Sequence, residues 1–135
     1  MNERALDHVG IAVQSLDRAI PFWTSIAGGD LTPREVVESQ GVEVVFIGTG
    51  DARVELLAPT RDDSPLARFL QKRGPGLHHV CYRVPDIAAA LAEAAAAGIE
   101  LIDRTARPGA YGHLVAFLHP RSADGVLIEL TQHTA

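Results

Sequence analysis

The chain has little of several residue types that define whole classes of protein. Its 135 residues include one cysteine, Cys81, so no internal disulfide can form and no oxidising compartment is required. Its apolar runs are far shorter than the roughly 18 residues that would span a membrane, and we expect no membrane partner. Lys and Arg number 12 against 17 Asp and Glu, and the resulting charge of −5 argues against nucleic-acid binding.

What is present is the composition of an ordinary folded protein. Hydrophobic residues make up 47% of the chain and charged residues 21%, which excludes a mainly disordered or fibrous chain. The length fits a single domain, residues 1–135. The first ten residues carry charges and no long apolar stretch, so we expect no secretory signal and a cytoplasmic location.

The most informative feature is an internal repeat. Residues 6–13 (LDHVGIAV) and 77–84 (LHHVCYRV) share Leu, His and Val at an offset of 71 residues. Residues 53–57 (RVELL) and 127–131 (LIELT) match at an offset of 74. The three-residue insertion falls in a turn, where changes in length are best tolerated.

Each half predicts the element order β-α-β-β-β. Ser15 and Asp86 are suitable N-caps for the two helices. Two further strand-like runs follow in each half, at residues 31–37, 42–47, 100–103 and 113–118. We therefore predict an α+β fold of two βαβββ modules within one domain. The predicted boundaries are module one at about 4–59, a linker with a short helix (Pro65 to about Lys72) at 60–76, and module two at about 77–132.

Four polar residues occupy equivalent places in the two modules: His8 and His79, and Glu55 and Glu129. Strand side chains alternate between faces, and the two histidines are in phase with each other. Taken singly, each residue is more often structural than a ligand, but their repetition favours a site. With the modules related by a pseudo-two-fold axis, the four would converge in a cupped mixed sheet on one divalent metal ion.

This donor set does not choose among Co, Mn, Ni, Zn and Mg. The remaining histidines of the second half, His113, His119 and His133, have no counterpart in the first half, and we expect His133 to be solvated.

The repeat and its motifs resemble the vicinal-oxygen-chelate superfamily, which includes glyoxalase I. Within it, the closer resemblance is to the methylmalonyl-CoA epimerase family, and it covers nearly the whole chain. Its most specific parts are residues 73–79 (RGPGLHH), 117–120 (FLHP) and 125–130 (GVLIEL). The His-Val core is shared more widely in the superfamily.

The resemblance implies a homodimeric, metal-dependent epimerase that interconverts the R and S forms of methylmalonyl-CoA. The C2 proton would be removed to give a metal-stabilised enolate. By resemblance Glu129 is the leading base, and we add the hypothesis that Glu55 is the partner base on the other side of the planar intermediate. Some family members carry a further catalytic Glu at the position held here by Val44. A one-residue shift along a strand changes the face, so Glu43 should not inherit that role.

Coenzyme A is polyanionic, so a protein of net negative charge needs a local basic patch to bind it. The family often has His or Gly where Tyr111 stands and Lys where His113 stands, so the role of that loop is open. The candidates for that patch are Lys72, Arg73, Arg107 and Arg121, although any one of them is more often a solvated surface charge. The predicted substrate-binding residues are Gln40, Lys72, Arg73, Tyr111, His113 and Arg121.

Two other functions stay open at this point. A glyoxalase I-type isomerase would use the same four ligands and the same proton-transfer logic. A metal-free protein that binds a small molecule would need no repeated ligands, and the metal content after purification without a chelator discriminates it.

Overall fold

The computed structural model describes residues 4–134 and confirms the α+β class. The chain divides into two compact units, residues 8–78 and the remainder, and the division falls inside strands β1 and β5. We call them the first and the second unit and describe each by itself. Within the described residues, no helix is both long and apolar enough to cross a membrane.

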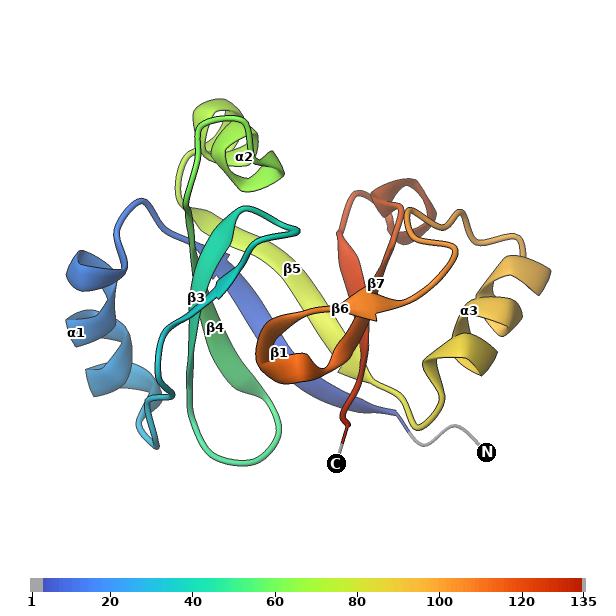
Figure 1. Cartoon of the computed structure of the whole chain (residues 1–135), viewed down its shortest axis with the longest axis horizontal. Coiled ribbons are helices and arrows are strands. Elements are labelled where there is room, and N and C mark those ends of the chain that lie inside the picture. Colours follow the sequence, from blue (N-terminus) through green and yellow to red (C-terminus); the bar gives the residue numbers. More distant parts are fainter. Residues whose placement is uncertain (1–3, 135) are drawn as a thin grey trace. The chain divides into compact units, whose positions relative to one another are not determined.

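The first unit has four strands in the order β2-β3-β4-β1 and two helices (Figure 1). β1 is parallel to β4, and β3 is antiparallel to both β2 and β4. The elements are β1 (Ala5–Ala12), α1 (Leu16–Ala27), β2 (Glu35–Val37), β3 (Val42–Ile47), β4 (Arg53–Pro59) and α2 (Pro65–Arg73).

The second unit repeats this pattern with the order β5-β8-β7-β6. β5 is parallel to β8, and β7 is antiparallel to both β8 and β6. Its elements are β5 (Gly76–Arg83), α3 (Ile87–Ala96), β6 (Arg107–Pro108), the 3-10 turn η1 (Ala110–Gly112), β7 (Leu114–Leu118), the 3-10 turn η2 (Pro120–Ala123) and β8 (Ile128–Gln132). The two βαβββ repeats expected from the sequence are thus confirmed.

The expected helix starts are also present, and each has its capping hydrogen bond. The side chain of Ser15 accepts from the backbone N–H of Arg18, and that of Asp86 accepts from Ala89. Ser64 caps α2 by accepting from the backbone N–H of Ala67, and Pro65 occupies the first helical position.

One predicted strand lies elsewhere. Residues 100–103 form only an isolated bridge, Leu101 with Leu118, and the strand beside β7 is instead Arg107–Pro108. The physical reason is at Asp103, whose Oδ2 accepts a hydrogen bond of 2.9 Å from the backbone N–H of Phe117. The Asp103 carboxylate thus takes the backbone N–H of β7 that a longer strand at residues 100–103 would need for its hydrogen bonds, and the chain leaves the sheet.

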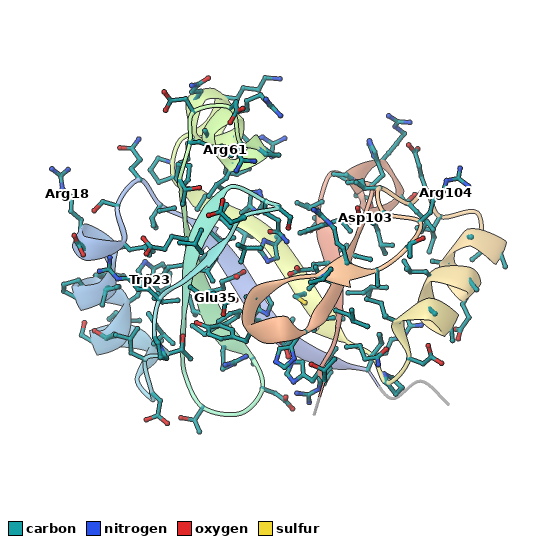
Figure 2. The ribbon with its side chains drawn as sticks, in the orientation of Figure 1. Arg18, Trp23, Glu35, Arg61, Asp103 and Arg104 are labelled. Atoms are coloured by element: carbon teal, nitrogen blue, oxygen red, sulfur yellow. The ribbon has the colours of Figure 1, made fainter. Side chains whose placement is uncertain are left out.

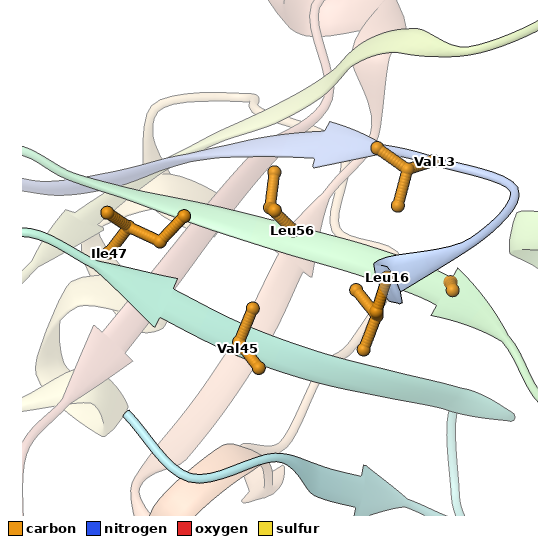
Figure 3. Packing of buried hydrophobic residues seen from close by; sticks show 6 residues of the cluster. Val13, Leu16, Val45, Ile47 and Leu56 are labelled. Atoms are coloured by element: carbon orange, nitrogen blue, oxygen red, sulfur yellow. The ribbon is translucent and has the colours of Figure 1, made fainter. Parts of the chain in front are cut away.

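One face of the first unit's sheet is an apolar core beneath α1. Val45 and Ile47 of β3 and Leu56 of β4 are fully buried there, and Val13 and Leu16 pack with them (Figure 3). In the second unit, the corresponding cluster consists of Val84, Ile87, Ala90, Leu91, Ala116 and Leu130. Because α1 and α3 cover these faces, the opposite face of each set of strands is left for polar groups.

We expect Leu56→Ala to lower the free energy of unfolding by about 2–5 kcal/mol, because truncating a fully buried leucine leaves a cavity. Leu31→Ala is the matched control, since the Leu31 side chain is 45% exposed and should cost about 0.5 kcal/mol or less. Urea unfolding followed by circular dichroism measures both. Equal losses for the two variants would contradict the assignment of this core.

Candidate metal centre

The first unit holds a buried histidine and glutamate in direct contact. His8 lies on β1 and Glu55 on β4, where Glu55 is the register partner of Gly10, two residues beyond His8. Nε2 of His8 is 3.2 Å from Oε1 of Glu55. The two residues are only 5% and 6% exposed, so the pair lies away from bulk solvent on the sheet face opposite α1.

The second unit holds the same arrangement. His79 lies on β5 and Glu129 on β8, where Glu129 is the register partner of Cys81, two residues beyond His79. Nε2 of His79 is 3.1 Å from Oε1 of Glu129. His79 is 2% exposed and Glu129 is 6% exposed. The repeat in the sequence is therefore also a repeat of one chemical pair.

A phenylalanine belongs to each pair, and the sequence reasoning missed both. Phe46 is the register partner of Glu55, and its ring meets that of His8 edge-on at 4.9 Å. Phe117 is the register partner of Glu129, and its ring meets that of His79 edge-on at 6.0 Å. The two phenylalanines keep the 71-residue offset of the histidines, so the repeat itself carried the signal.

An arginine lies over each of these rings. The Arg53 guanidinium is 4.5 Å from the centroid of Phe46, and the Arg107 guanidinium is 5.9 Å from that of Phe117. Arg53 comes from β4 and Arg107 from β6, at positions that the repeat does not relate. Comparison of the two halves of the sequence therefore could not have paired them.

Buried imidazoles and carboxylates are costly unless they bind a partner. His8, Glu55, His79 and Glu129 are all buried, and each pair offers one imidazole nitrogen and one carboxylate oxygen. Such nitrogen and oxygen donors suit divalent ions from manganese to zinc. The donor chemistry of the two pairs thus fits a metal ion, and it does not select which one.

The face expected for Glu43 is confirmed. Glu43 shares its face of β3 with Val45 and Ile47, which pack toward α1, whereas Val44 shares the face of Phe46 and is 1% exposed. The pKa of the Arg34 guanidinium is raised, chiefly by its hydrogen bond to Asp17 and also by the charges of Asp17 and Glu43, against a desolvation effect that lowers it. The Glu43 carboxylate therefore acts on the α1 side of the sheet.

The predicted substrate-binding residues of the first unit lie in a turn and at a helix end. Gln40 is in the β2–β3 turn, where its backbone N–H donates to the carbonyl of Val37. Lys72 and Arg73 occupy the exposed last turn of α2. The Arg73 guanidinium lies 5.7 Å from the ring centroid of Phe69. Their part in binding a substrate stays a prediction.

The predicted substrate-binding residues of the second unit lie in or next to two 3-10 turns. Tyr111 in η1 has a left-handed backbone, with φ of 57°. His113 follows it, and its Nδ1 accepts from the backbone N–H of Thr134 at 3.1 Å. Arg121 in η2 forms an exposed ion pair of 2.9 Å with Glu100. For these residues too, a role in substrate binding stays a prediction.

His133 was expected to be solvated, and it is exposed, but it also has two partners within its unit. Its ring stacks on that of His113 at 4.1 Å, and its Nε2 is 2.8 Å from Oδ1 of the buried Asp7. A buried carboxylate needs a hydrogen-bonding partner, and His133 supplies one. His133 is thus exposed as expected, and its contacts with His113 and Asp7 are what its position in the chain did not indicate.

Comparison with known proteins adds to these observations. The model of the Glyoxalase/Bleomycin resistance protein/Dioxygenase superfamily matches residues 7–117. Human mitochondrial methylmalonyl-CoA epimerase is 41% identical over 128 residues, which cover 94% of this chain and 73% of that protein. An uncharacterized protein of Bacillus subtilis is 40% identical over 127 residues, 94% of this chain and 91% of its own.

A solved structure has the same fold. It is a variant of Streptomyces coelicolor methylmalonyl-CoA epimerase in complex with 2-nitronate-propionyl-CoA, and it aligns with a TM-score of 0.92 at 34% identity. The alignment covers 97% of this chain and 95% of that one. An enzyme and an uncharacterized protein are therefore both among the relatives of this chain.

Proposed function

This chain belongs to the Glyoxalase/Bleomycin resistance protein/Dioxygenase superfamily, and from this we propose that it is a metal-dependent epimerase. Its substrate is methylmalonyl-CoA, whose R and S forms it interconverts by removing the C2 proton and returning it to the opposite face. The similarity to methylmalonyl-CoA epimerases over 94% of the chain supports the choice of substrate.

The observation that carries the proposal is the buried His–Glu pair present once in each unit. A reaction that inverts one carbon needs a proton acceptor on one side and a proton donor on the other. A single pair would explain proton removal but not return from the opposite face. Two equivalent pairs supply a carboxylate for each side.

We propose further that His8, Glu55, His79 and Glu129 together hold one divalent ion. Each residue contributes one ligand atom, and all four side chains are buried as metal ligands usually are. The ion would supply Lewis-acid stabilisation of the negative charge that develops on the thioester oxygen when C2 loses its proton.

The protein's own residues then have separate roles. Glu129 accepts the C2 proton at a carboxylate oxygen and afterwards releases it to solvent, whereas Glu55 takes up a solvent proton and donates it to the other face. His8 and His79 hold these carboxylates in place through contacts of 3.2 and 3.1 Å. The rings of Phe46 and Phe117 pack edge-on against the two imidazoles and help to fix their orientation.

The first test is exchange of the C2 proton. The protein is loaded with cobalt and given methylmalonyl-CoA in heavy water, and deuterium entry at C2 is followed by mass spectrometry. We expect exchange well above a control without protein, and Glu43→Gln should preserve it because Glu43 faces α1. Exchange no faster than in the control, with metal bound, would reject the proposal and favour a glyoxalase I-type reaction.

A further inference from the structure

Arg107 lies on the same sheet face as the second His–Glu pair. It is the register partner of Val115 on β7, and Phe117, two residues further along β7, is the register partner of Glu129. Directly paired residues, and residues two apart along a strand, share a face. The Arg107 side chain therefore leaves β6 on the face where Glu129 leaves β8.

Two residues fix the direction of that side chain. Nε of Arg107 is 3.5 Å from Oδ1 of Asp103, whose other oxygen accepts from the backbone N–H of Phe117 at 2.9 Å. The guanidinium also lies over the Phe117 ring, at 5.9 Å from its centroid. Because the Asp103 carboxylate is itself held by β7, Arg107 is braced against the strand that faces Glu129.

The guanidinium still has donors to offer. Its Nε is buried and makes no hydrogen bond to any described residue, so the contact with Asp103 is a long ion pair only. Within residues 4–134, Asp103 and the Phe117 ring are the only side-chain partners of this group. A guanidinium has five N–H donors in a planar fork, and only the Nε of this half-exposed side chain points at Asp103. Its remaining donors can bind a second anion.

A carboxylate fits this place better than a phosphate. A planar fork binds either anion through two parallel hydrogen bonds, so the choice depends on charge and place, and Arg107 is one braced, half-buried cation, enough for a single carboxylate. The phosphates of coenzyme A need several exposed cations, which the last turn of α2 offers in Lys72 and Arg73. The face that Arg107 shares with Glu129 is where the reacting part of a substrate belongs.

We infer that Arg107 binds the free carboxylate of a malonyl-type thioester and thereby selects such substrates over neutral acyl thioesters. Asp103 and Phe117 are its positioning residues. The inference rests on the proposed function, because it takes the reacting acyl group to lie beside Glu129. It adds a residue that binds the substrate's negative charge, because the His–Glu pairs do not explain how a charged acyl group is selected over a neutral one.

The test compares two ligands that differ only in that charge. Isobutyryl-CoA carries a methyl group where methylmalonyl-CoA carries the carboxylate, and both carry the same coenzyme. Isothermal titration calorimetry gives the Kd of each for the unaltered protein and for Arg107→Met. We expect Arg107→Met to weaken methylmalonyl-CoA binding by about 10- to 100-fold, as for loss of a charged hydrogen bond, and isobutyryl-CoA binding by less than about twofold.

Arg104→Met is the matched control. Arg104 is three residues from Arg107, but it is exposed and lines a groove beside α3 rather than the face of Glu129. Figure 2 labels Arg104 on the α3 side and Asp103 nearer to β6. We expect the control to bind both ligands as the unaltered protein does.

The outcomes separate the possibilities. Equal weakening of both ligands would place Arg107 against the coenzyme and overturn the inference, and so would unchanged binding of both. Asp103→Asn is the second variant, which keeps Arg107 and is expected to weaken methylmalonyl-CoA selectively by several-fold. Failure of the proposed reaction is detected by a different measurement, the deuterium exchange at C2. A protein that shows no exchange but still binds methylmalonyl-CoA more tightly than isobutyryl-CoA because of Arg107 would contradict the reaction and keep this inference.

Discussion

Glu129→Gln is expected to slow deuterium entry at C2 of methylmalonyl-CoA by about 10²- to 10⁴-fold, the usual contribution of a general base. Glutamine has nearly the same shape as glutamate, so the fold and the register of β8 with β5 and β7 should persist. It cannot accept a proton, however. Mass spectrometry of the exchanged substrate measures the loss, with metal content and thermal unfolding recorded on the same sample.

Glu55→Gln gives the contrasting result. If Glu129 removes the proton and Glu55 returns it from the other face, this variant should exchange one configuration of the substrate without inverting it. Chiral analysis of the recovered thioester distinguishes exchange from inversion. Full epimerase turnover by Glu55→Gln at full metal occupancy would eliminate Glu55 as the partner base, and full exchange by Glu129→Gln would eliminate Glu129.

The second large effect concerns the number of metal ions. If both His–Glu pairs hold one ion, the protein binds one equivalent of cobalt. His8→Ala and His79→Ala should then each weaken that binding by more than the roughly 10–100-fold that partners outside the ligand shell cost. Equilibrium dialysis with metal analysis gives the stoichiometry and affinity. His119→Ala is the control, because Nδ1 of His119 is occupied by the backbone N–H of Arg121 in η2.

The same measurement would contradict a shared site in a definite way. Two equivalents in the unaltered protein, with one lost in each histidine variant, would mean that each pair binds its own ion. Binding that survives in both variants would mean that the His–Glu pairs are structural. In either case, proton exchange would need a different explanation from the one proposed.

The repeat made most of the fold predictable from the sequence. The offsets of 71 and 74 residues gave the βαβββ order, and Ser15, Asp86 and Pro65 gave the helix starts. Local rules suffice there, because a capping side chain acts within three residues of its own position. The phase of the strands likewise placed His8 and His79 without knowledge of their partners.

What the sequence did not give depends on contacts between distant residues. The strand at Arg107–Pro108 was missed because Asp103 takes a backbone donor of β7. The bond of His133 to Asp7 joins residues near opposite ends of the chain, so no local pattern indicates it. Arg53 and Arg107 cover equivalent rings from positions that are not equivalent, which only coordinates reveal.

The difference in length between the two halves has a consequence for the history of the chain. The two halves differ by three residues in the turn before their last strand. Even so, Phe46 is paired with Glu55 in the first half, and Phe117 is paired with Glu129 in the second. Pairing along the strands, rather than the length of the turn, fixes that alignment. The loops after β3 and β7 are therefore where this lineage could change length without disturbing its chemistry.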